Sequence, residues 1–237
     1  PTGINFFRSI LGTLSLAPYE GRTRVFIIQD IEQFHVAAGS ALLKLLEEPP
    51  PQSLIILTSS NPDFVLPTII SRCQIVELQP LSIKQVRETL QKKFGEENDQ
   101  LDEVVKLSQG RIGWALDALQ RPDKLVALHR QLERITDVAR SSLENRFHYA
   151  DDLSRRFFGD KEAVFQELTI WVEWARDILL LQKGMEDNLV FTRWRSSTEM
   201  YANKIDFAQT LAWIKRIQET IDALHRNANA KIALEFL

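Results

Sequence analysis

The sequence of 237 residues has little of several residue types, and each shortage excludes a class of protein. Its one cysteine, Cys73, cannot form an internal disulfide, and its four scattered histidines form no cluster with metal-ligand spacing. No run of about 18 apolar residues is present, which argues against a membrane-spanning helix. The single cysteine favours a reducing, cytoplasmic setting.

Glycine is also scarce, and the chain has no excess of positive charge. The 9 glycines are fewer than an average usage of about 7% would give, which favours a helix-rich protein. The net charge of −3 argues against a basic, nucleic-acid-binding surface over the whole chain and leaves open a local patch. The first ten residues, PTGINFFRSI, do not resemble a signal peptide. Because they lack a Met and open directly into helical periodicity, we expect the chain to be a fragment whose beginning lies upstream.

The first 80 residues alternate between strand-like and helix-like patterns. Val25–Ile28 is a continuous β-branched and aromatic run, typical of a parallel strand covered on both faces. The alternation predicts an α/β domain with a parallel sheet. The expected elements are a helix at about 4–14, strands at 25–28, 53–60 and 74–80, a helix at 36–46 stopped by the prolines at 49–51, and a short helix from Pro67.

After Pro80 the pattern is helical throughout. Ser82 is the expected N-cap of a helix that ends near Gly95. The sequence thus divides into an α/β block (1–80), a three-helix block (81–121) and a helical bundle (122–237). Further helices are expected at 99–110, 111–120, 123–147, 149–158, 161–183, 196–201 and 206–235, the last with one apolar stripe of Phe207, Leu211, Ile214, Ile217, Ile221 and Leu224.

Two polar residues follow the first strand. In P-loop NTPases an Asp at this position holds Mg²⁺ and the next Glu polarises the attacking water. Here the corresponding residues are Gln29, which has no charge, and Asp30, which is shorter than Glu. The phosphate-binding loop GxxxxGK[ST] does not occur in the sequence. We therefore interpret both residues as polar groups at a sheet edge and do not expect this chain alone to hydrolyse ATP.

A long stretch carries a family resemblance. ALLKLLEEPPPQSLIILTSSNPDFVLPTIISRC, residues 41–73, resembles the core of clamp-loader AAA+ subunits almost residue for residue, and the flanking YEGRTRVFII also fits. The resemblance implies a partial AAA+ sheet of the P-loop type without its Walker A part, a three-helix lid and a C-terminal helical collar. It also implies that Ser71, Arg72 and Cys73 form the SRC motif of that family.

In the family, the Arg of the SRC motif is an arginine finger that points into ATP held by a neighbouring subunit. The resemblance assigns this role to Arg72. A purely structural interpretation would have Arg72 cap helix carbonyls or pair with Glu47 or Glu48, and the surrounding motif favours the finger. Cys73 is interpreted as a small buried apolar residue, because nothing beside it predicts a lowered thiol pKa.

The sequence departs from the ATPase pattern in three places, and in these it resembles the delta-prime type of bacterial DNA polymerase III subunit. Gln29 and Asp30 replace the acidic pair. The lid motif GSxRxAL appears as GRIGWAL, which puts Gly113 where the ATP-sensing arginine belongs, and Arg111 falls about 200° away around the helix. The C-terminal LHRNANAKIALEFL is similar to the end of delta-prime collars.

The resemblance implies a non-hydrolysing subunit of the DNA polymerase III holoenzyme, with no cofactor of its own. ATP and Mg²⁺ would belong to a neighbouring subunit. The implied partners are the gamma/tau ATPase and delta subunits and, through the assembled complex, the sliding clamp and primer-template DNA. One alternative is an ATP-hydrolysing gamma/tau-type subunit whose Walker A motif lies upstream. Another is an AAA+ helicase loader or Holliday-junction motor, which the absence of a late strand pair for a winged helix disfavours.

Two further groups have structural interpretations. Thr58 and Ser59 lie where the family places a γ-phosphate sensor, and we interpret them as hydrogen-bonding groups at a strand end. The amphipathic helices that carry tryptophans have no basic stripe, so the indoles are expected in the bundle core or at a subunit interface. These are Trp171, Trp174, Trp194 and Trp213.

Overall fold

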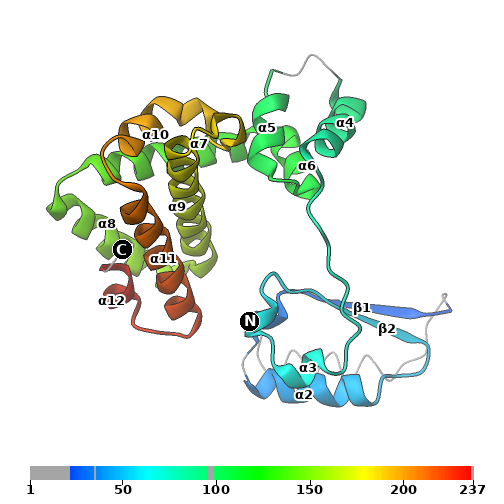
Figure 1. The fold of residues 1–237 in the computed structure, drawn as a ribbon. Helices are drawn as coiled ribbons and strands as arrows, with labels where there is room; N and C mark the ends of the chain where they lie inside the picture. Colours follow the sequence, from blue (N-terminus) through cyan, green and yellow to red (C-terminus); the bar gives the residue numbers. More distant parts are fainter. Residues whose placement is uncertain (1–21, 35, 96–98, 236–237) are drawn as a thin grey trace. The chain divides into compact units, whose positions relative to one another are not determined.

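The computed structural model describes residues 22–34, 36–95 and 99–235 (Figure 1). They fall into two compact units with a boundary between Leu78 and Gln79. The first contains a small sheet with two helices, and the second is helical. The helix expected at 4–14 lies outside the described residues, and the division into three domains stays a prediction.

The sheet of the first unit has two described strands, β1 (Arg24–Ile28) and β2 (Ser53–Leu57). They pair in parallel with Phe26 opposite Ile55. The 3-10 turn η1 (Ile31–Gln33) and α2 (Val36–Glu47) make the crossover between them. After β2 come the 3-10 turn η2 (Pro62–Phe64) and α3 (Pro67–Ile70). Both strands and the helix from Pro67 confirm the sequence prediction.

One face of this sheet is buried and the other is exposed among the described residues. Ile28, Leu42, Leu45 and Ile69 form a core that joins β1 to α2 and α3. On the opposite face, apolar side chains remain in contact with solvent. Their exposed fractions are 50% for Val25, 64% for Ile27, 50% for Leu54 and 39% for Ile56. The expectation that both faces of the strands are covered is therefore wrong for the described part of the chain.

The prediction of a third strand at 74–80 is also wrong. These residues are irregular and exposed, with exposed fractions of 66% for Ile75, 73% for Val76 and 90% for Leu78. An alternating sequence fits a pleated, half-buried surface, but a strand forms only where a neighbouring strand takes up its backbone N–H and C=O groups. In the described residues β1 and β2 pair only with each other.

The second unit begins with three helices, α4 (Ile83–Phe94), α5 (Leu101–Ser108) and α6 (Ile112–Gln120), as the sequence predicts. The expected caps of α4 are confirmed. The Ser82 hydroxyl accepts from the Gln85 N–H at 3.3 Å, and the Gln85 side chain accepts from the Ser82 N–H at 2.9 Å. Gly95 ends the helix with φ of 85°, a conformation that only glycine adopts without strain.

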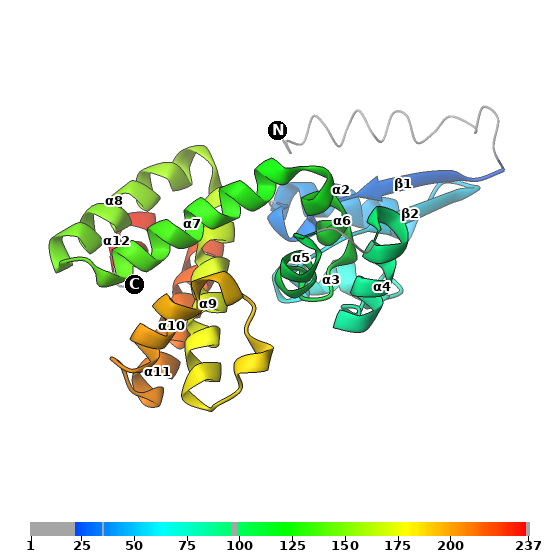
Figure 2. The ribbon, with the colours of Figure 1, turned by 90° about the horizontal axis from the view of Figure 1, so that it is seen from above.

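A bundle follows, in which α9 (Lys161–Gln182) is central (Figure 1). Against it pack α7 (Pro122–Arg140), α8 (Leu143–Gly159), α10 (Arg195–Ala202) and α11 (Phe207–His225). The last helix, α12 (Ala230–Glu235), packs mainly on α8, which follows α7 after two residues (Figure 2). Two 3-10 turns, η3 (Glu186–Asn188) and η4 (Thr192–Trp194), lie between α9 and α10.

The tryptophans lie where the sequence predicts, in the bundle core. Trp171, Trp174 and Trp194 are buried, and Trp213 is half-buried against the same core. The rings of Trp171, Trp174 and Trp213 meet edge to face, with centroids 5.5 to 6.0 Å apart. This arrangement is favoured by the aromatic quadrupole.

Two helix ends were placed wrongly by periodicity. The helix expected at 123–147 ends at Arg140, because the Ser142 hydroxyl accepts from the Asn145 N–H at 3.4 Å and starts a new helix. The helix expected at 206–235 is two helices. Asn227 adopts a left-handed φ of 57°, and the Asn229 side chain caps the N–H of Lys231 at 3.1 Å.

The single stripe expected on the last helix is also only partly buried. Ile217 and Leu224 lie in the core, whereas Phe207 and Leu211 are 40% and 51% exposed. The buried side of α11 includes Thr210 instead, whose hydroxyl lies 3.2 Å from the amide nitrogen of Gln182. The side of α11 that faces α9 is thus shifted around the helix from the purely apolar stripe.

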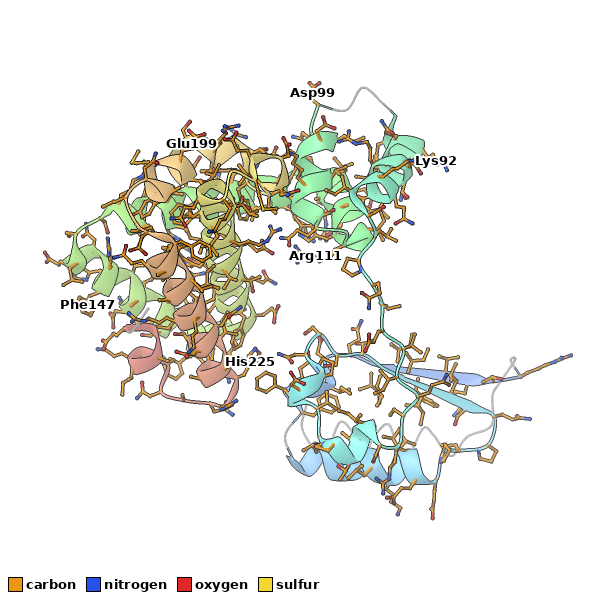
Figure 3. All side chains as sticks on the ribbon, in the orientation of Figure 1. Lys92, Asp99, Arg111, Phe147, Glu199 and His225 are labelled. Atoms are coloured by element: carbon orange, nitrogen blue, oxygen red, sulfur yellow. The ribbon has the colours of Figure 1, made fainter. Side chains whose placement is uncertain are left out.

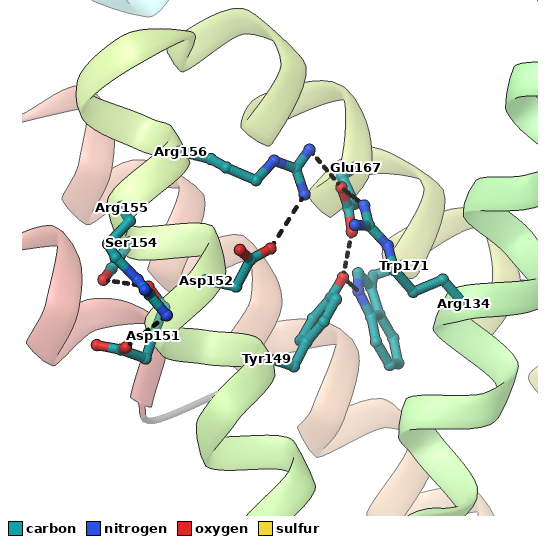
Figure 4. A network of polar contacts seen from close by, with 9 residues as sticks. All are labelled: Arg134, Tyr149, Asp151, Asp152, Ser154, Arg155, Arg156, Glu167 and Trp171. Carbon is teal, nitrogen blue, oxygen red and sulfur yellow. Dashed lines mark hydrogen bonds and ion pairs between the residues drawn. The ribbon is translucent and has the colours of Figure 1, made fainter.

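A buried carboxylate ties three helices of the bundle together (Figure 4). Glu167 on α9 is fully buried and accepts from Arg134 on α7, from Arg156 on α8 at 2.9 Å and from the Tyr149 hydroxyl at 2.5 Å. Trp171 in turn donates its indole N–H to the Tyr149 oxygen at 2.8 Å. A charge buried at this position is tolerated only because each of its oxygens has a partner.

Replacing Glu167 by Gln should lower the free energy of unfolding by about 2–4 kcal/mol, because two arginines lose their carboxylate. Urea unfolding followed by tryptophan fluorescence measures this. Glu162→Gln, on an exposed turn of the same helix, is the control and should change the value by less than about 0.5 kcal/mol. Equal effects of the two substitutions would contradict the role of the buried network.

Gly110 and Gly113 make a matched pair in one motif. Gly110 has φ of +85°, and a Cβ there would lie 2.4 Å from the Leu81 carbonyl oxygen, whereas a Cβ on Gly113 meets nothing within 4 Å. Gly110→Ala should therefore destabilise by about 2 kcal/mol or more. Gly113→Ala should stabilise by about 0.5–1 kcal/mol, because alanine favours the helix. Thermal unfolding of both variants checks the opposite signs.

Candidate functional site

Arg72 is held on a short turn that is anchored in the core of the first unit. Pro67 occupies the first position of α3, where its missing N–H costs nothing. Ile69 is 2% exposed and fixes the turn to the sheet core. The Arg72 N–H then donates to the Ile69 carbonyl at 3.0 Å, and the Cys73 N–H donates to the Ile70 carbonyl at 3.1 Å. These two hydrogen bonds and the buried Ile69 side chain fix the backbone that carries the guanidinium.

The Arg72 guanidinium has partners in its own unit and still reaches solvent. Its Nη2 lies 2.7 Å from Oε1 of Glu47, and its Nη1 donates to the Thr68 carbonyl at 3.0 Å. The side chain is 38% exposed and that of Glu47 is 52% exposed. Both contacts of the structural interpretation, a helix carbonyl and an ion pair with Glu47, are therefore present. A pair this exposed contributes only about 0–1 kcal/mol, so a stronger anion can replace the carboxylate.

The other two residues of the motif have local roles. The Ser71 hydroxyl donates to the Thr68 carbonyl at 3.1 Å and lies 3.4 Å from Nη1 of Arg72. Cys73 is half-buried against the core of the first unit, and burial raises the pKa of its thiol. A raised pKa leaves the thiol protonated, which fits the interpretation of Cys73 as a packing residue.

Gln29 and Asp30 are both exposed at the end of β1. Asp30 adopts a left-handed backbone with φ of 53°, which turns the chain out of the strand. The turn is closed by Thr58, whose N–H donates to the Ile28 carbonyl at 2.9 Å and whose carbonyl accepts from Ile31 at 3.1 Å. Thr58 thus acts as a hydrogen-bonding group at the strand end through its backbone.

Glu32 is a carboxylate at this edge that the sequence analysis missed. Its Oε1 accepts from the Ser60 hydroxyl at 2.8 Å and from the Ser60 N–H at 3.2 Å. Burial would raise the pKa of Glu32, but hydrogen bonds from its own backbone, Ser59 and Ser60 outweigh burial and lower the pKa. The sequence feature that could have identified Glu32 is the polar run of Thr58, Ser59 and Ser60 after β2. The carboxyl ends of parallel strands lie at one edge of the sheet, so this run is expected beside the residues that follow β1.

Gly113 is the second residue of α6, in the second unit, and a Cβ added to it would meet nothing within 4 Å. Arg111 lies just before this helix and is labelled in Figure 3. Its Nε donates to the Ser108 carbonyl at 3.0 Å, and its Nη2 lies 3.6 Å from Glu173 on α9. Burial raises the pKa of Glu173, and the charge of Arg111 acts in the opposite direction.

Neither a metal centre nor a membrane span is found in the part of the chain that the structure describes. No three His, Cys, Asp or Glu side chains are grouped so that they could hold a metal ion in residues 22–34, 36–95 and 99–235. Within the same ranges no helix combines the length and the apolar character that crossing a membrane requires.

Comparisons with known proteins agree with the resemblance seen in the sequence. Residues 2–82 match a family model described as DNA polymerase III, delta subunit. Over 220 residues the chain is 27% identical to DNA polymerase III subunit delta' of Bacillus subtilis, covering 92% of this chain and 65% of that protein. It is 31% identical over 128 residues to subunit tau of Salmonella typhimurium, covering 53% of this chain and 20% of that protein.

A delta' subunit of Haemophilus influenzae is 31% identical over 118 residues, which is 50% of this chain and 36% of that protein. The chain thus spans less than two thirds of the length of these relatives. A solved structure of a DNA polymerase III gamma subunit-related protein from Thermotoga maritima is 24% identical, with a TM-score of 0.42 over 96% of this chain and 80% of that one. These sequence matches confirm the similarity to the delta' and gamma/tau subunits.

Replacing Ser60 by Ala should raise the pKa of Glu32, because burial is then opposed by fewer hydrogen bonds. The stability that a carboxylate with a lowered pKa provides is present above its unfolded pKa and is lost as the pH falls through its folded pKa. A ¹³C NMR titration of the Glu32 carboxyl measures the shift. Ser53→Ala removes a hydroxyl that donates to the Pro50 carbonyl at 2.6 Å and should leave the Glu32 titration unchanged.

Proposed function

We propose that this chain, a homologue of the clamp-loader subunits of DNA polymerase III, is a subunit that does not hydrolyse ATP and supplies Arg72 to the ATP of a neighbouring subunit. In this role it helps to load the sliding clamp onto primer-template DNA during replication. The observation that carries the proposal is the position of Arg72. A rigid, anchored turn holds its guanidinium at the surface, where an exchangeable carboxylate is one of its partners.

The chemistry follows from the properties of arginine. The guanidinium is always charged and presents a planar fork of N–H donors that matches two phosphate oxygens. In the free chain Nη2 is directed to Glu47, while the Thr68 carbonyl orients Nη1. When a neighbour's ATP approaches, Nη2 exchanges the carboxylate for the γ-phosphate and stabilises the charge that develops there during phosphoryl transfer. The weak ion pair with Glu47 thus orients the Arg72 guanidinium in the free chain and can be replaced by the phosphate.

Three features support a chain without its own ATPase site. Gln29 stands in place of an acidic metal ligand. Glu32 is the nearby carboxylate, and its hydrogen bonds to Ser60 give it a structural role at the sheet edge. Gly113 offers no charge where an ATP-sensing arginine would lie. ATP and Mg²⁺ therefore belong to the neighbouring subunit, and this chain binds no cofactor.

The helical bundle supports an assembly role. In this proposal it acts as a collar that packs against the collars of gamma/tau and delta subunits and sets the position of this chain in the ring. Contact with the clamp and with DNA is made through the assembled complex, because the chain carries a net charge of −3 and no general basic surface.

The second candidate is an ATP-hydrolysing subunit of the gamma/tau type. It is favoured by the 31% identity to a tau subunit over 128 residues, which exceeds the 27% identity to the delta' subunit of B. subtilis over a longer range. The two candidates differ in nucleotide affinity. Saturable binding of fluorescent ATP to the full-length protein supports the gamma/tau type, and its absence supports the finger-donating subunit.

Replacing Arg72 by Ala should reduce DNA-stimulated ATP hydrolysis at the neighbour's site by about 10³-fold in a reconstituted clamp loader, because arginine fingers supply about 10³–10⁵-fold. Arg72→Lys should recover little of the activity, since an ammonium cannot form the bidentate contact. Steady-state ATPase and clamp-loading assays, with subunit assembly checked by gel filtration, measure both.

Glu47→Gln is the matched control, because it removes the ion pair and keeps the finger. It should leave ATP hydrolysis at or above the level of the unmodified protein. If Glu47→Gln reduced turnover as much as Arg72→Ala, the ion pair would be the functional element and Arg72 would be a structural residue. Unchanged turnover in Arg72→Ala would also contradict the finger.

A further inference from the structure

A groove of about 740 Å³ opens in the helical bundle between α8 and α11. Both helices pack on α9 and on α12, and Leu234 of α12 lines the groove. Trp171 of α9 and Tyr201 of α10 line it, together with Trp213 of α11. We call it the α8–α11 groove. Its volume lies within the range of about 300–1,000 Å³ that is usual for binding pockets.

The groove is apolar and its rim is exposed. Phe147, labelled on α8 in Figure 3, is 49% exposed, and Leu143 one turn earlier is 68% exposed. The indole N–H of Trp171 is already used by Tyr149, so this wall offers an apolar ring to an occupant. A small ligand would be enclosed by the groove and would leave these rim residues in water. A rim with large exposed apolar side chains instead fits a partner protein.

The charges around the groove are mainly positive, although the whole chain has a net charge of −3. Arg146, Lys204 and Arg216 line it from α8, from the segment before α11 and from α11 itself. Glu235 is the one carboxylate among the lining residues, and it lies 4.0 Å from the ammonium of Lys231. The local excess of positive charge selects an acidic occupant.

A buried polar atom indicates a specific anchor. The Tyr201 hydroxyl is buried and has no hydrogen-bond partner in the described structure. Burial raises the pKa of this hydroxyl, while Arg146 and Arg140 act in the opposite direction, so it remains a protonated donor at neutral pH. A buried donor without an acceptor is destabilising, and a carboxylate or amide oxygen of an occupant can satisfy it.

We propose that the α8–α11 groove binds an acidic amphipathic helix of a partner protein. Apolar side chains at helical spacing fill the groove against Phe147 and Trp213, and acidic side chains on the flanks face Arg146, Lys204 and Arg216. One side-chain oxygen of the helix accepts from the Tyr201 hydroxyl. The proposal does not depend on the proposed role of Arg72, which lies in the other unit.

The probes are fluorescein-labelled synthetic helical peptides, a panel with Leu and Phe at the i, i+3, i+4 and i+7 positions and Glu on both flanks. A matched panel has Lys in place of Glu. Fluorescence anisotropy with the whole protein should show saturable binding of acidic peptides and none of the lysine peptides. Quenching of tryptophan fluorescence should accompany binding, because Trp171 and Trp213 line the groove.

Arg216→Glu should weaken the binding of acidic peptides by about fivefold or more, because it puts a like charge beside them. Lys215→Glu is the matched control. It makes the same change of charge on the neighbouring residue of α11, which does not line the groove. Its effect should be less than about twofold.

Tyr201→Phe tests the contribution of the hydroxyl to binding, because it keeps the buried ring and removes only the hydroxyl. It should leave the thermal stability equal or higher, because an unpaired buried hydroxyl is removed, and it should weaken the binding of peptides that carry the accepting oxygen.

Four results overturn the proposal: no peptide binds, both panels bind equally, Arg216→Glu has no greater effect than Lys215→Glu, or Tyr201→Phe leaves the binding of every acidic peptide unchanged. Binding of 8-anilinonaphthalene-1-sulfonate that Arg216→Glu abolishes, without peptide binding, would assign the groove to a small organic anion and also overturn the helix.

Discussion

The half-exposed ion pair between Arg72 and Glu47 connects the fold of the first unit to its proposed function. It links the end of α2 to the turn after α3, and both elements are fixed by a shared core that includes Leu42 and Ile69. Because both side chains reach solvent, their attraction is weak, and the guanidinium can change partners without any change of the backbone. A finger needs this combination of a rigid base and an exchangeable contact.

The second unit uses arginine and carboxylate in the opposite way. Glu167 is fully buried and is hydrogen-bonded by two arginines and a tyrosine hydroxyl, so loss of the arginines would leave a buried charge unpaired (Figure 4). The same chemistry is therefore permanent in the bundle and reversible beside α3. Solvent access decides the difference, because water weakens the pair and also offers replacement partners.

Local signals in the sequence predicted those elements whose stability is local. The capping box at Ser82, the glycine at position 95 and the proline at position 67 each specify a helix end through their own side chain or backbone. The prediction of a strand at 74–80 was wrong because a strand needs a neighbouring strand to pair with, and the alternating sequence pattern does not show whether one is present. The break between α11 and α12 was not predicted, because the apolar periodicity on both sides of Asn227 gave no sign of its left-handed backbone.

The sequence by itself determined the family resemblance, the helical character of the chain after Pro80 and the identity of Arg72 as the candidate finger. These depend on residue type and spacing, which are readable without coordinates. Only the tertiary structure decided that Glu47 pairs with Arg72, that Ser60 holds Glu32 and that a groove with a buried, unpaired Tyr201 hydroxyl lies between α8 and α11. Each of these joins residues far apart in the chain. Their distances and burial follow from how the helices and strands pack, and no local pattern records that packing.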